Sequence, residues 1–303
     1  MQVVETVREL QQLADAERAA GHRIGLVPTM GALHAGHLSL VGEARQRADR
    51  VWVSIFVNPA QFNEAADLEG YPRTFEEDLA ACRQRGVDVV FAPEAAEMYT
   101  PGSQSWVDVT ELTKPLCGSA RPGHFRGVTT IVTKLLLAAK PHVAVFGQKD
   151  FQQLAVIRRM VRDLGFDVEI VGGPTVREAD GLALSNRNVN LDPEARRQAV
   201  ALVRALDAAE NAVAAGECGS AALLHLVTTE IGKASRARLD YAELRDPEDL
   251  SPAPGVLKRP TLLALAVFFD PPQRCDGATV RLIDNRVLNP QPYMEDSQSS
   301  EPR

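Results

Sequence analysis

The chain has 303 residues, 45% of them hydrophobic and 24% charged, a balance typical of a globular protein with one large domain or two smaller ones. Its formal net charge is −7, and the absence of a basic excess argues against a nucleic-acid-binding protein. The N-terminus alternates apolar and charged residues, which excludes a signal peptide, and no run approaches the roughly 20 apolar residues of a membrane span. We therefore expect a soluble, cytoplasmic protein.

The cysteines are far apart in the sequence and include no C-x-x-C pair. This spacing is typical of reduced thiols and not of a zinc site or a disulfide framework. The four are Cys82, Cys117, Cys218 and Cys275.

Short apolar runs alternate with amphipathic stretches over the first 175 residues. Val3, Val7, Leu10 and Ala14 fall on one stripe and predict a helix over 3–20. The predicted strands are 24–27, 51–57, 87–91, 143–146 and 168–171, and the further predicted helices are 38–48, 74–85, 128–139 and 151–163, with a capping box of Thr74 and Glu77 opening the second of these. This alternation predicts an α/β fold, a Rossmann-like parallel sheet with helices on both faces.

The pattern changes after about residue 176. Predicted helices over 193–215 and 220–234 precede predicted strands over 238–244, 262–269 and 280–283. We therefore expect a nucleotide- and substrate-binding domain over 1–175 and a smaller α+β domain over 176–288. The polar, proline-bearing residues 289–303 are predicted to be a disordered tail.

The most informative segment runs from Pro28 to His37, directly after the first strand of the α/β pattern. Gly31 and Gly36 allow the backbone to approach a ligand, and His34 and His37 stand at the expected start of a helix. A helix N-terminus offers unpaired N–H groups and a positive dipole end to phosphate. A turn with two surface histidines is the weaker interpretation, because this one turn holds two of the chain's six histidines.

Polar residues also follow the strand 51–57. Asn58 and Gln61 stand where ligands bind to open α/β sheets, in the crevice at the carboxyl ends of the strands. From the residues alone, an ordinary polar loop is an equally good interpretation.

The strand 143–146 ends in a similar way. Gly147 permits close backbone approach, Lys149 is a point charge suited to phosphate, and Gln153 lies one helical turn further on the same face. Asp150 either caps the next helix or accepts a hydrogen bond from a ribose or a water. A cap accounts for Asp150 alone, and leaves the lysine and the glutamine unexplained.

The string P-T-M-G-A-L-H-A-G-H over 28–37 resembles the pantoate–β-alanine ligases (pantothenate synthetases) of the nucleotidylyltransferase superfamily. The blocks 54–62, 146–153 and 174–188 resemble the same family in the same order, so the likeness spans roughly residues 24–285. The block 174–188 resembles the family's nucleotide-closing loop, which is compatible with a polar hinge between domains. The chain has Leu184 and Asn186 where the family pattern leads us to expect methionine and serine.

The resemblance implies a set of site residues. Those expected to bind ATP are Met30, Gly31, Ala32, Leu33, His34, Ala35, Gly36, His37, Gly147, Gln148, Lys149, Asp150, Val176, Leu184, Ser185, Asn186 and Arg187. The expected catalytic residues are His34, His37, Lys149, Ser185 and Arg187, and those expected to bind pantoate or β-alanine are Asn58, Gln61 and Gln153.

The resemblance also covers two regions with less defined roles. His124 and Arg126 are expected to order a loop over the pantoate pocket. Glu77 and Asp78 match a family region associated with Mg²⁺, but acidic residues at a helix start are usually solvated and favour the helix dipole. We therefore expect Mg²⁺ on the ATP phosphates and keep these two carboxylates only as candidate ligands.

The implied activity is ATP-dependent condensation of pantoate with β-alanine to pantothenate, through a pantoyl adenylate, with release of AMP and pyrophosphate. The expected partners are these small molecules and a second copy in a homodimer, without nucleic acid or membrane. Two alternatives stay open: a nucleotidylyltransferase that makes a dinucleotide-like product, and a catalytically silent ligand- or RNA-binding module. The acidic charge argues against RNA.

Overall fold

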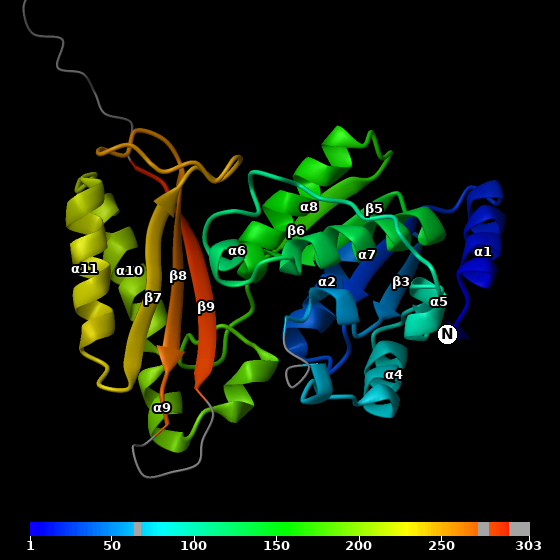
Figure 1. Ribbon diagram of the computed structural model, residues 1–303, viewed down its shortest axis with the longest axis horizontal. Coiled ribbons are helices and arrows are strands. Elements are labelled where there is room, and N and C mark those ends of the chain that lie inside the picture. The colour runs from blue at the N-terminus through cyan, green and yellow to red at the C-terminus, as the bar shows by residue number, and fades with distance from the viewer. Residues whose placement is uncertain (64–67, 272–278, 291–303) are drawn as a thin grey trace, which may run out of the picture. The chain divides into compact units, whose positions relative to one another are not determined.

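The structure is a computed structural model of the chain and describes residues 1–63, 68–271 and 279–290. Two compact units are present, one from Met1 to Val189 and one that begins at Asn190 (Figure 1). Within the described residues no helix is long and apolar enough to cross a membrane. Cys82, Cys117 and Cys218 are free thiols, whereas Cys275 and the predicted tail from residue 291 onward lie outside the described residues.

The first unit is built on a six-stranded sheet with the order β1-β4-β3-β2-β5-β6. Its strands are β1 (Gln2–Val4), β2 (Ile24–Thr29), β3 (Arg50–Ile55), β4 (Val89–Phe91), β5 (Val143–Gly147) and β6 (Glu169–Gly173). Every neighbouring pair is parallel. The predicted Rossmann-like α/β fold is confirmed.

Helices connect these strands and cover the sheet. They are α1 (Val7–Ala19), α2 (Ala35–Arg45), α4 (Phe75–Gln84), α5 (Ala95–Met98), α6 (Cys117–Ala120), α7 (His124–Ala139) and α8 (Phe151–Asp163), with short 3₁₀ turns η1 (Pro59–Gln61), η2 (Gln148–Asp150) and η3 (Asn186–Asn190). Helix α7 lies beside α1 and α8, whereas α2 packs on β2, β3, β5 and β6.

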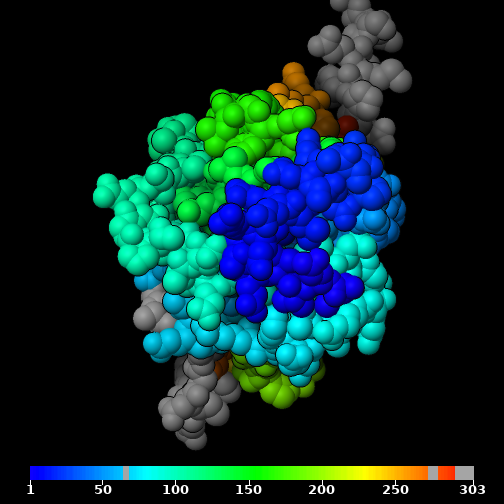
Figure 2. Space-filling view, turned by 90° about the vertical axis from the view of Figure 1, so that its right-hand side faces the viewer, coloured from blue at the N-terminus to red at the C-terminus, as the bar shows by residue number. Residues whose placement is uncertain are grey.

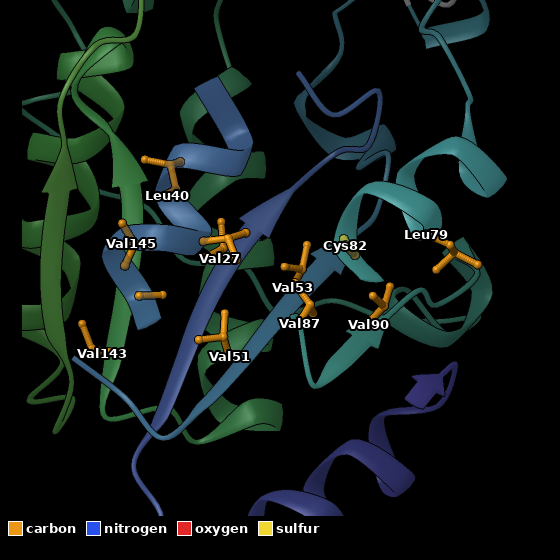
Figure 3. Close-up of a cluster of buried hydrophobic side chains, with 12 residues drawn as sticks. Val27, Leu40, Val51, Val53, Leu79, Cys82, Val87, Val90, Val143 and Val145 are labelled. Carbon is orange, nitrogen blue, oxygen red and sulfur yellow. The ribbon is translucent and has the colours of Figure 1, made fainter. Parts of the chain in front are cut away.

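One hydrophobic cluster shows how α2 and α4 bury the sheet (Figure 3). Leu40 of α2 and Leu79 of α4 pack with Val27, Val53 and Val145, which come from three neighbouring strands. These strand residues are at most 1% exposed. The apolar runs that predict the strands are therefore the core of the sheet, as expected for parallel strands buried on both faces.

The strand order reverses next to β2. The chain passes from β2 outward to β3 and β4, and later returns to place β5 on the other side of β2. The carboxyl ends of β2 and β5, at Thr29 and Gly147, therefore diverge into loops from the same edge of the sheet. Open α/β sheets bind ligands in the crevice at such a switch point.

The first residues differ from the prediction. Residues 2–4 form the edge strand β1, and the helix predicted from residue 3 begins at Val7, where Thr6 caps it by accepting a hydrogen bond from the Glu9 N–H. Val3 is 37% exposed and belongs to the strand and not to the helical stripe. Figure 2 shows that the first residues of the chain, in dark blue, lie at the surface.

Two other helix starts differ from the prediction. Thr74 precedes α4 without a side-chain cap, and its hydroxyl donates to Asp78 at 3.3 Å, so the predicted capping box is absent. Helix α7 begins at His124, four residues before the predicted start. Its first turns are buried nearly all round, at Phe125, Gly127 and Thr129, so the sequence shows no polar–apolar stripe there.

The second unit contains the helices α9 (Pro193–Gln198), α10 (Ala201–Ala214) and α11 (Ser220–Gly232), and the strands β7 (Ala237–Arg245), β8 (Thr261–Phe269) and β9 (Val280–Leu288). The strands form an antiparallel sheet in chain order, which confirms the predicted α+β character. The single helix predicted over 193–215 is interrupted at Ala199 and Val200. Strand β9 extends five residues beyond the predicted end. The prediction stopped early because polar residues such as Asp284 and Arg286 interrupt the apolar run.

The two compact units divide after Val189, whereas the sequence analysis places a domain boundary after residue 175. The segment between these positions folds back on itself, since the Leu184 N–H donates to the Val176 carbonyl and Arg177 bridges Ala183. Its Asn186 side chain bonds with Tyr71 of the first unit. These contacts explain why this segment belongs to the first compact unit.

Candidate functional site

The turn after β2 is held in an unusual backbone conformation. Gly31 has φ +83° and Ala32 has φ +51°, so both lie in the left-handed region, which costs a residue with a side chain more than it costs glycine. The Asp78 carboxylate, 2% exposed in the first turn of α4, accepts hydrogen bonds from the N–H groups of Ala32 at 2.9 Å and Leu33 at 2.7 Å. The turn is therefore fastened to α4 by one buried carboxylate.

The two histidines at the start of α2 have a defined protonation pattern. The Gly36 N–H donates to Nδ1 of His34 at 3.1 Å, and the His34 N–H points at Nδ1 of His37 at 3.4 Å. Because each Nδ1 accepts a hydrogen bond, each neutral ring carries its proton on Nε2. The rings are stacked with centroids 4.1 Å apart, so the helix N-terminus presents two neighbouring Nε2–H donors.

Burial keeps these rings uncharged. Burial, and then the charge of Lys149, lowers the pKa of His34. Burial, and then the neighbouring His34, lowers the pKa of His37 to about 4. Near neutral pH both imidazoles therefore act as neutral donors, and the ammonium of Lys149 supplies positive charge beside them.

Lys149 and Asp150 lie in η2, directly after β5. Their charges act on both His34 and His37, which places all four side chains within electrostatic reach of one another. A Cβ added at Gly147 would meet nothing within 4 Å, so the backbone there borders open space. The ends of β2 and β5 thus bring together the histidines and the lysine that the sequence analysis assigned to ATP.

The residues after β3 lie against the same turn. Gln61 directs its Nε2 at the Met30 sulfur, 2.9 Å away, and its Oε1 accepts a hydrogen bond from Asn58 at 3.1 Å. Asn58 is 1% exposed, and its side chain is held among backbone and side-chain partners. Gln61 therefore lies beside the histidine turn, residues 30–37, and Asn58 lies behind Gln61.

His124 and Arg126 start α7 and have different surroundings. Nδ1 of His124 lies 2.7 Å from the Gln61 carbonyl oxygen, and burial, then the charge of Arg121, lowers the pKa of His124 to about 4. The guanidinium of Arg126 lies 4.6 Å from the centroid of the Trp106 ring. His124 thus steadies the backbone of Gln61, and Arg126 stacks on a surface aromatic ring.

Of the segment 174–188, Leu184 lies against the turn after β2. Leu184 lies next to Gly36, since a Cβ built on that glycine would be 3.8 Å from the Leu184 Cβ. The Arg187 N–H donates to the Ser185 hydroxyl at 3.2 Å, and the charge of Arg187 acts on His124. Ser185, Asn186 and Arg187 therefore lie in the first unit together with the strand-end residues.

Tyr71 contacts the candidate site residue Asn186, and the sequence analysis did not single it out. Burial raises the pKa of its hydroxyl, while its bond to Asn186 and the charge of Arg187 oppose this rise. It stands in a segment without apolar periodicity, so no pattern pointed to it. The hydrogen bond shows that Asn186, which replaces the expected serine, keeps a polar partner.

Gln153 lies partly buried in the first turn of α8. Within the described residues no hydrogen bond joins it to Gln61. Its neighbour Gln152 is buried and structural, because its carboxamide bonds to Leu112, Pro115 and Cys117.

The two candidate metal ligands, Glu77 and Asp78, differ in their exposure to solvent. Glu77 is exposed, whereas Asp78 is buried and accepts the two N–H groups of the turn. Among the described residues there is no group of three histidine, cysteine, aspartate or glutamate side chains placed to hold a metal ion.

A doubly wound parallel sheet with a histidine-bearing turn and a lysine at its switch point defines a nucleotide-binding α/β protein. The family model described as Pantoate-beta-alanine ligase matches residues 2–287. The chain belongs to the pantoate–β-alanine ligase family.

Relatives and solved structures agree with this membership. The chain is 52% identical over 290 residues to the pantothenate synthetase of Syntrophobacter fumaroxidans, covering 96% of this chain and 99% of that one. It is similar to the structure of pantothenate synthetase from Thermus thermophilus, with a TM-score of 0.86, 45% identity, and coverage of 96% and 100%. The ligase of Francisella tularensis, solved in complex with "Beta-gamma ATP" and β-alanine, has a TM-score of 0.76 at 31% identity over 95% of this chain and 97% of that one.

Proposed function

We propose that this enzyme joins pantoate to β-alanine in two steps that share one site. In the first step a pantoate carboxylate oxygen attacks the α-phosphorus of ATP, and the bond to the β-phosphate oxygen breaks, giving pantoyl adenylate and pyrophosphate. In the second step the neutral amine of β-alanine attacks the acyl carbon, the carbon–oxygen bond to AMP breaks, and the amine loses a proton as pantothenate forms.

The observation that carries this proposal is the meeting of the two Nε2–H donors and Lys149 at the switch point between β2 and β5. Charge on the phosphate oxygens changes as the α-phosphorus becomes five-coordinate, and preorganised donors stabilise such charge without reorganising. His34, His37 and Lys149 are proposed to do this, with Ser185 and Arg187 adding contacts from the closing loop.

The backbone of the site is proposed to hold the nucleotide. The segment Met30–His37 and the segment Gly147–Asp150 come from the two strands that flank the crevice. Val176 and Leu184 approach from the closing loop, where Leu184 lies next to Gly36. The ligand named for the Francisella tularensis relative supports a nucleotide at the corresponding place in this chain.

Pantoate is proposed to lie beside Gln61, with Gln153 as a second contact and Asn58 as the residue that supports Gln61 from behind. The Nε2–H of Gln61 that faces the Met30 sulfur is suited to a carboxylate or hydroxyl oxygen. β-Alanine is proposed to enter the same cavity, where exclusion of water protects the mixed anhydride from hydrolysis.

Mg²⁺ is proposed to arrive with ATP, bound to its phosphate oxygens. The acidic residues at the start of α4 do not form a cage for it, because Asp78 is already engaged by two backbone N–H groups. Mg²⁺ commonly keeps several waters and binds through substrate phosphates. The ion would neutralise phosphate charge, while the protein's own residues orient the reacting atoms.

We further propose a cytoplasmic homodimer that has neither a nucleic-acid nor a membrane partner. The net charge of −7 supports the absence of a polyanion partner. Light scattering coupled to gel filtration measures the mass, and a monomer at micromolar concentration would contradict the dimer.

The two-step mechanism is tested by isotope exchange. Because pantoyl adenylate forms before the amine attacks, exchange between pyrophosphate and ATP is expected with pantoate and Mg²⁺ alone. Exchange that requires β-alanine would rule out the adenylate step. Product analysis with both acids present separates the alternatives: AMP with pantothenate, a nucleotidyl product, or no product.

A further inference from the structure

A tyrosine outside the proposed substrate contacts is joined to them through Asn58. Tyr99 follows α5, and its hydroxyl donates to Oδ1 of Asn58 at 2.8 Å. Among the described residues the Asn58 carboxamide has three other partners: its Oδ1 accepts from the Ala60 N–H at 3.3 Å, and its Nδ2 donates to the Gly127 carbonyl and to Gln61 Oε1, each at 3.1 Å. The bond from Tyr99 is the shortest of the four.

This network decides which end of Gln61 faces the site. Because Oε1 of Gln61 is occupied by Asn58, its Nε2 is directed at the Met30 sulfur, 2.9 Å away. A thioether is a weak acceptor, so this N–H can be taken over by a stronger one. If the carboxamide of Gln61 were turned over, an oxygen would face a substrate carboxylate and repel it.

We propose that Tyr99 is a positioning residue for pantoate: its hydroxyl fixes the Asn58 carboxamide, which in turn makes Gln61 present its N–H and not its carbonyl oxygen to the substrate. This inference rests on the proposed function, since it concerns the substrate proposed for Gln61. The Ala60 N–H and the Gly127 carbonyl determine which way round the Asn58 carboxamide lies. The Tyr99 hydroxyl holds the oxygen of that carboxamide in place.

The hydroxyl and the ring of Tyr99 make different contacts. The ring lies 6.3 Å from the Trp106 ring, and the Lys134 ammonium lies 5.6 Å from its centroid. A phenylalanine keeps both ring contacts and loses only the donor. Burial raises the pKa of Tyr99 to about 12, so the hydroxyl remains a donor throughout the neutral range.

The test is steady-state kinetics of Tyr99→Phe. The KM for pantoate is expected to rise about tenfold, equivalent to about 1.4 kcal/mol. The KM for ATP, and kcat at saturating pantoate, are expected to stay within about twofold, because the lost contact concerns the binding of one substrate. Tyr241→Phe, in β7 of the second unit, serves as the matched control and is expected to leave all constants unchanged.

A double-mutant cycle shows whether Tyr99 acts through Gln61. Pantoate affinity is measured by calorimetry with α,β-methylene ATP, which cannot be cleaved at the α-phosphorus, for the parent, Tyr99→Phe, Gln61→Ala and the double variant. In the Gln61→Ala background the tyrosine change is expected to weaken pantoate binding less than about twofold. The same tenfold loss in both backgrounds would overturn the proposal.

The remaining outcomes are also decisive. A lower melting temperature of Tyr99→Phe with unchanged pantoate affinity would show a purely structural role and overturn the inference. A parent protein that makes no pantothenate would instead contradict the proposed function, so the two failures are distinguishable.

Discussion

At the scale of single residues, the site assigns different tasks to its charged and neutral donors. His34 and His37 are neutral Nε2–H donors near pH 7, whereas Lys149 is a cation beside them. Loss of the lysine should therefore remove charge stabilisation, whereas the turn keeps the hydrogen bonds that Asp78 accepts from Ala32 and Leu33.

Lys149→Ala is expected to lower kcat by about 10²–10³-fold, the usual cost of removing one preorganised donor. Its melting temperature should hardly change, because a lysine at the rim of a sheet contributes little to stability. Lys114→Ala, which removes an exposed lysine of the same unit, is the control and should retain activity. Turnover of Lys149→Ala within a few-fold of the parent would remove Lys149 from the mechanism.

A substitution of Asp78 tests whether this carboxylate holds the turn or binds a metal ion. Asp78→Asn keeps the size of the side chain. It directs an NH₂ group at one of the two backbone N–H groups that donate hydrogen bonds to Asp78 in the parent protein. We expect a loss of about 1–3 kcal/mol in the free energy of unfolding and a lower kcat/KM for ATP, because the turn bearing His34 loosens.

The control for this change is the adjacent exposed carboxylate. Glu77→Gln should match the parent in stability and in its Mg²⁺ requirement. A marked rise in the Mg²⁺ concentration needed by Glu77→Gln would show that this carboxylate binds the ion. An unchanged melting curve of Asp78→Asn would show that the turn does not depend on Asp78.

At the scale of elements, helix α2 offers a matched pair of glycines. A Cβ at Gly36 would lie 2.8 Å from Cε1 and 2.9 Å from Nδ1 of the His34 ring, whereas a Cβ at Gly42 would meet nothing within 4 Å. The first glycine is therefore needed for the place of the histidine, and the second is not needed for packing.

Gly36→Ala is expected to displace the His34 ring and to lower kcat/KM for ATP at least about tenfold, because a misplaced catalytic group loses much of its effect. Gly42→Ala should keep full activity and stabilise the helix by about 0.5–1 kcal/mol, because alanine loses less backbone entropy than glycine in a helix. Kinetics and thermal melts on both variants decide the matter. Equal activities would show that His34 does not need its observed position.

At the scale of the whole molecule, the buried histidines tie stability to pH. The pKa values of His37 and His124 are both lowered to about 4, mainly by burial, from an ordinary value of 6.5. Between these values the unfolded chain binds more protons than the folded one, so stability rises with pH across this window and is lost as pH falls through it. Above about pH 6.5 these two rings cause no further change.

The melting temperature is therefore expected to fall between about pH 6.5 and 4, with at most about 3 kcal/mol of destabilisation per ring, reduced by the partial solvent exposure of both. His124→Gln should flatten this dependence, whereas replacement of the exposed His225 by glutamine should not. Differential scanning calorimetry at several pH values provides the measurement. A His124→Gln variant with the parent's slope would exclude His124 as a source.

The sequence by itself determined the features that are local or periodic. Apolar runs predicted five of the six parallel strands, because strands buried on both faces must be apolar throughout. Glycines and histidines in one strand-to-helix turn predicted an anion site, since a helix N-terminus has unpaired N–H groups whatever the rest of the fold. Strand β1 was not predicted, because an edge strand of three residues is too short to show a periodic pattern of apolar residues.

Only the tertiary structure decided which distant residues meet. Asp78 fastens a turn 45 residues earlier, and Tyr99 holds Asn58 across 41 residues. No local pattern encodes such pairs, because they depend on which strand ends the crossovers bring together. The proton positions on His34 and His37 and the low pKa of His37 also follow from burial and hydrogen-bond geometry, which exist only once the sheet and its helices have packed.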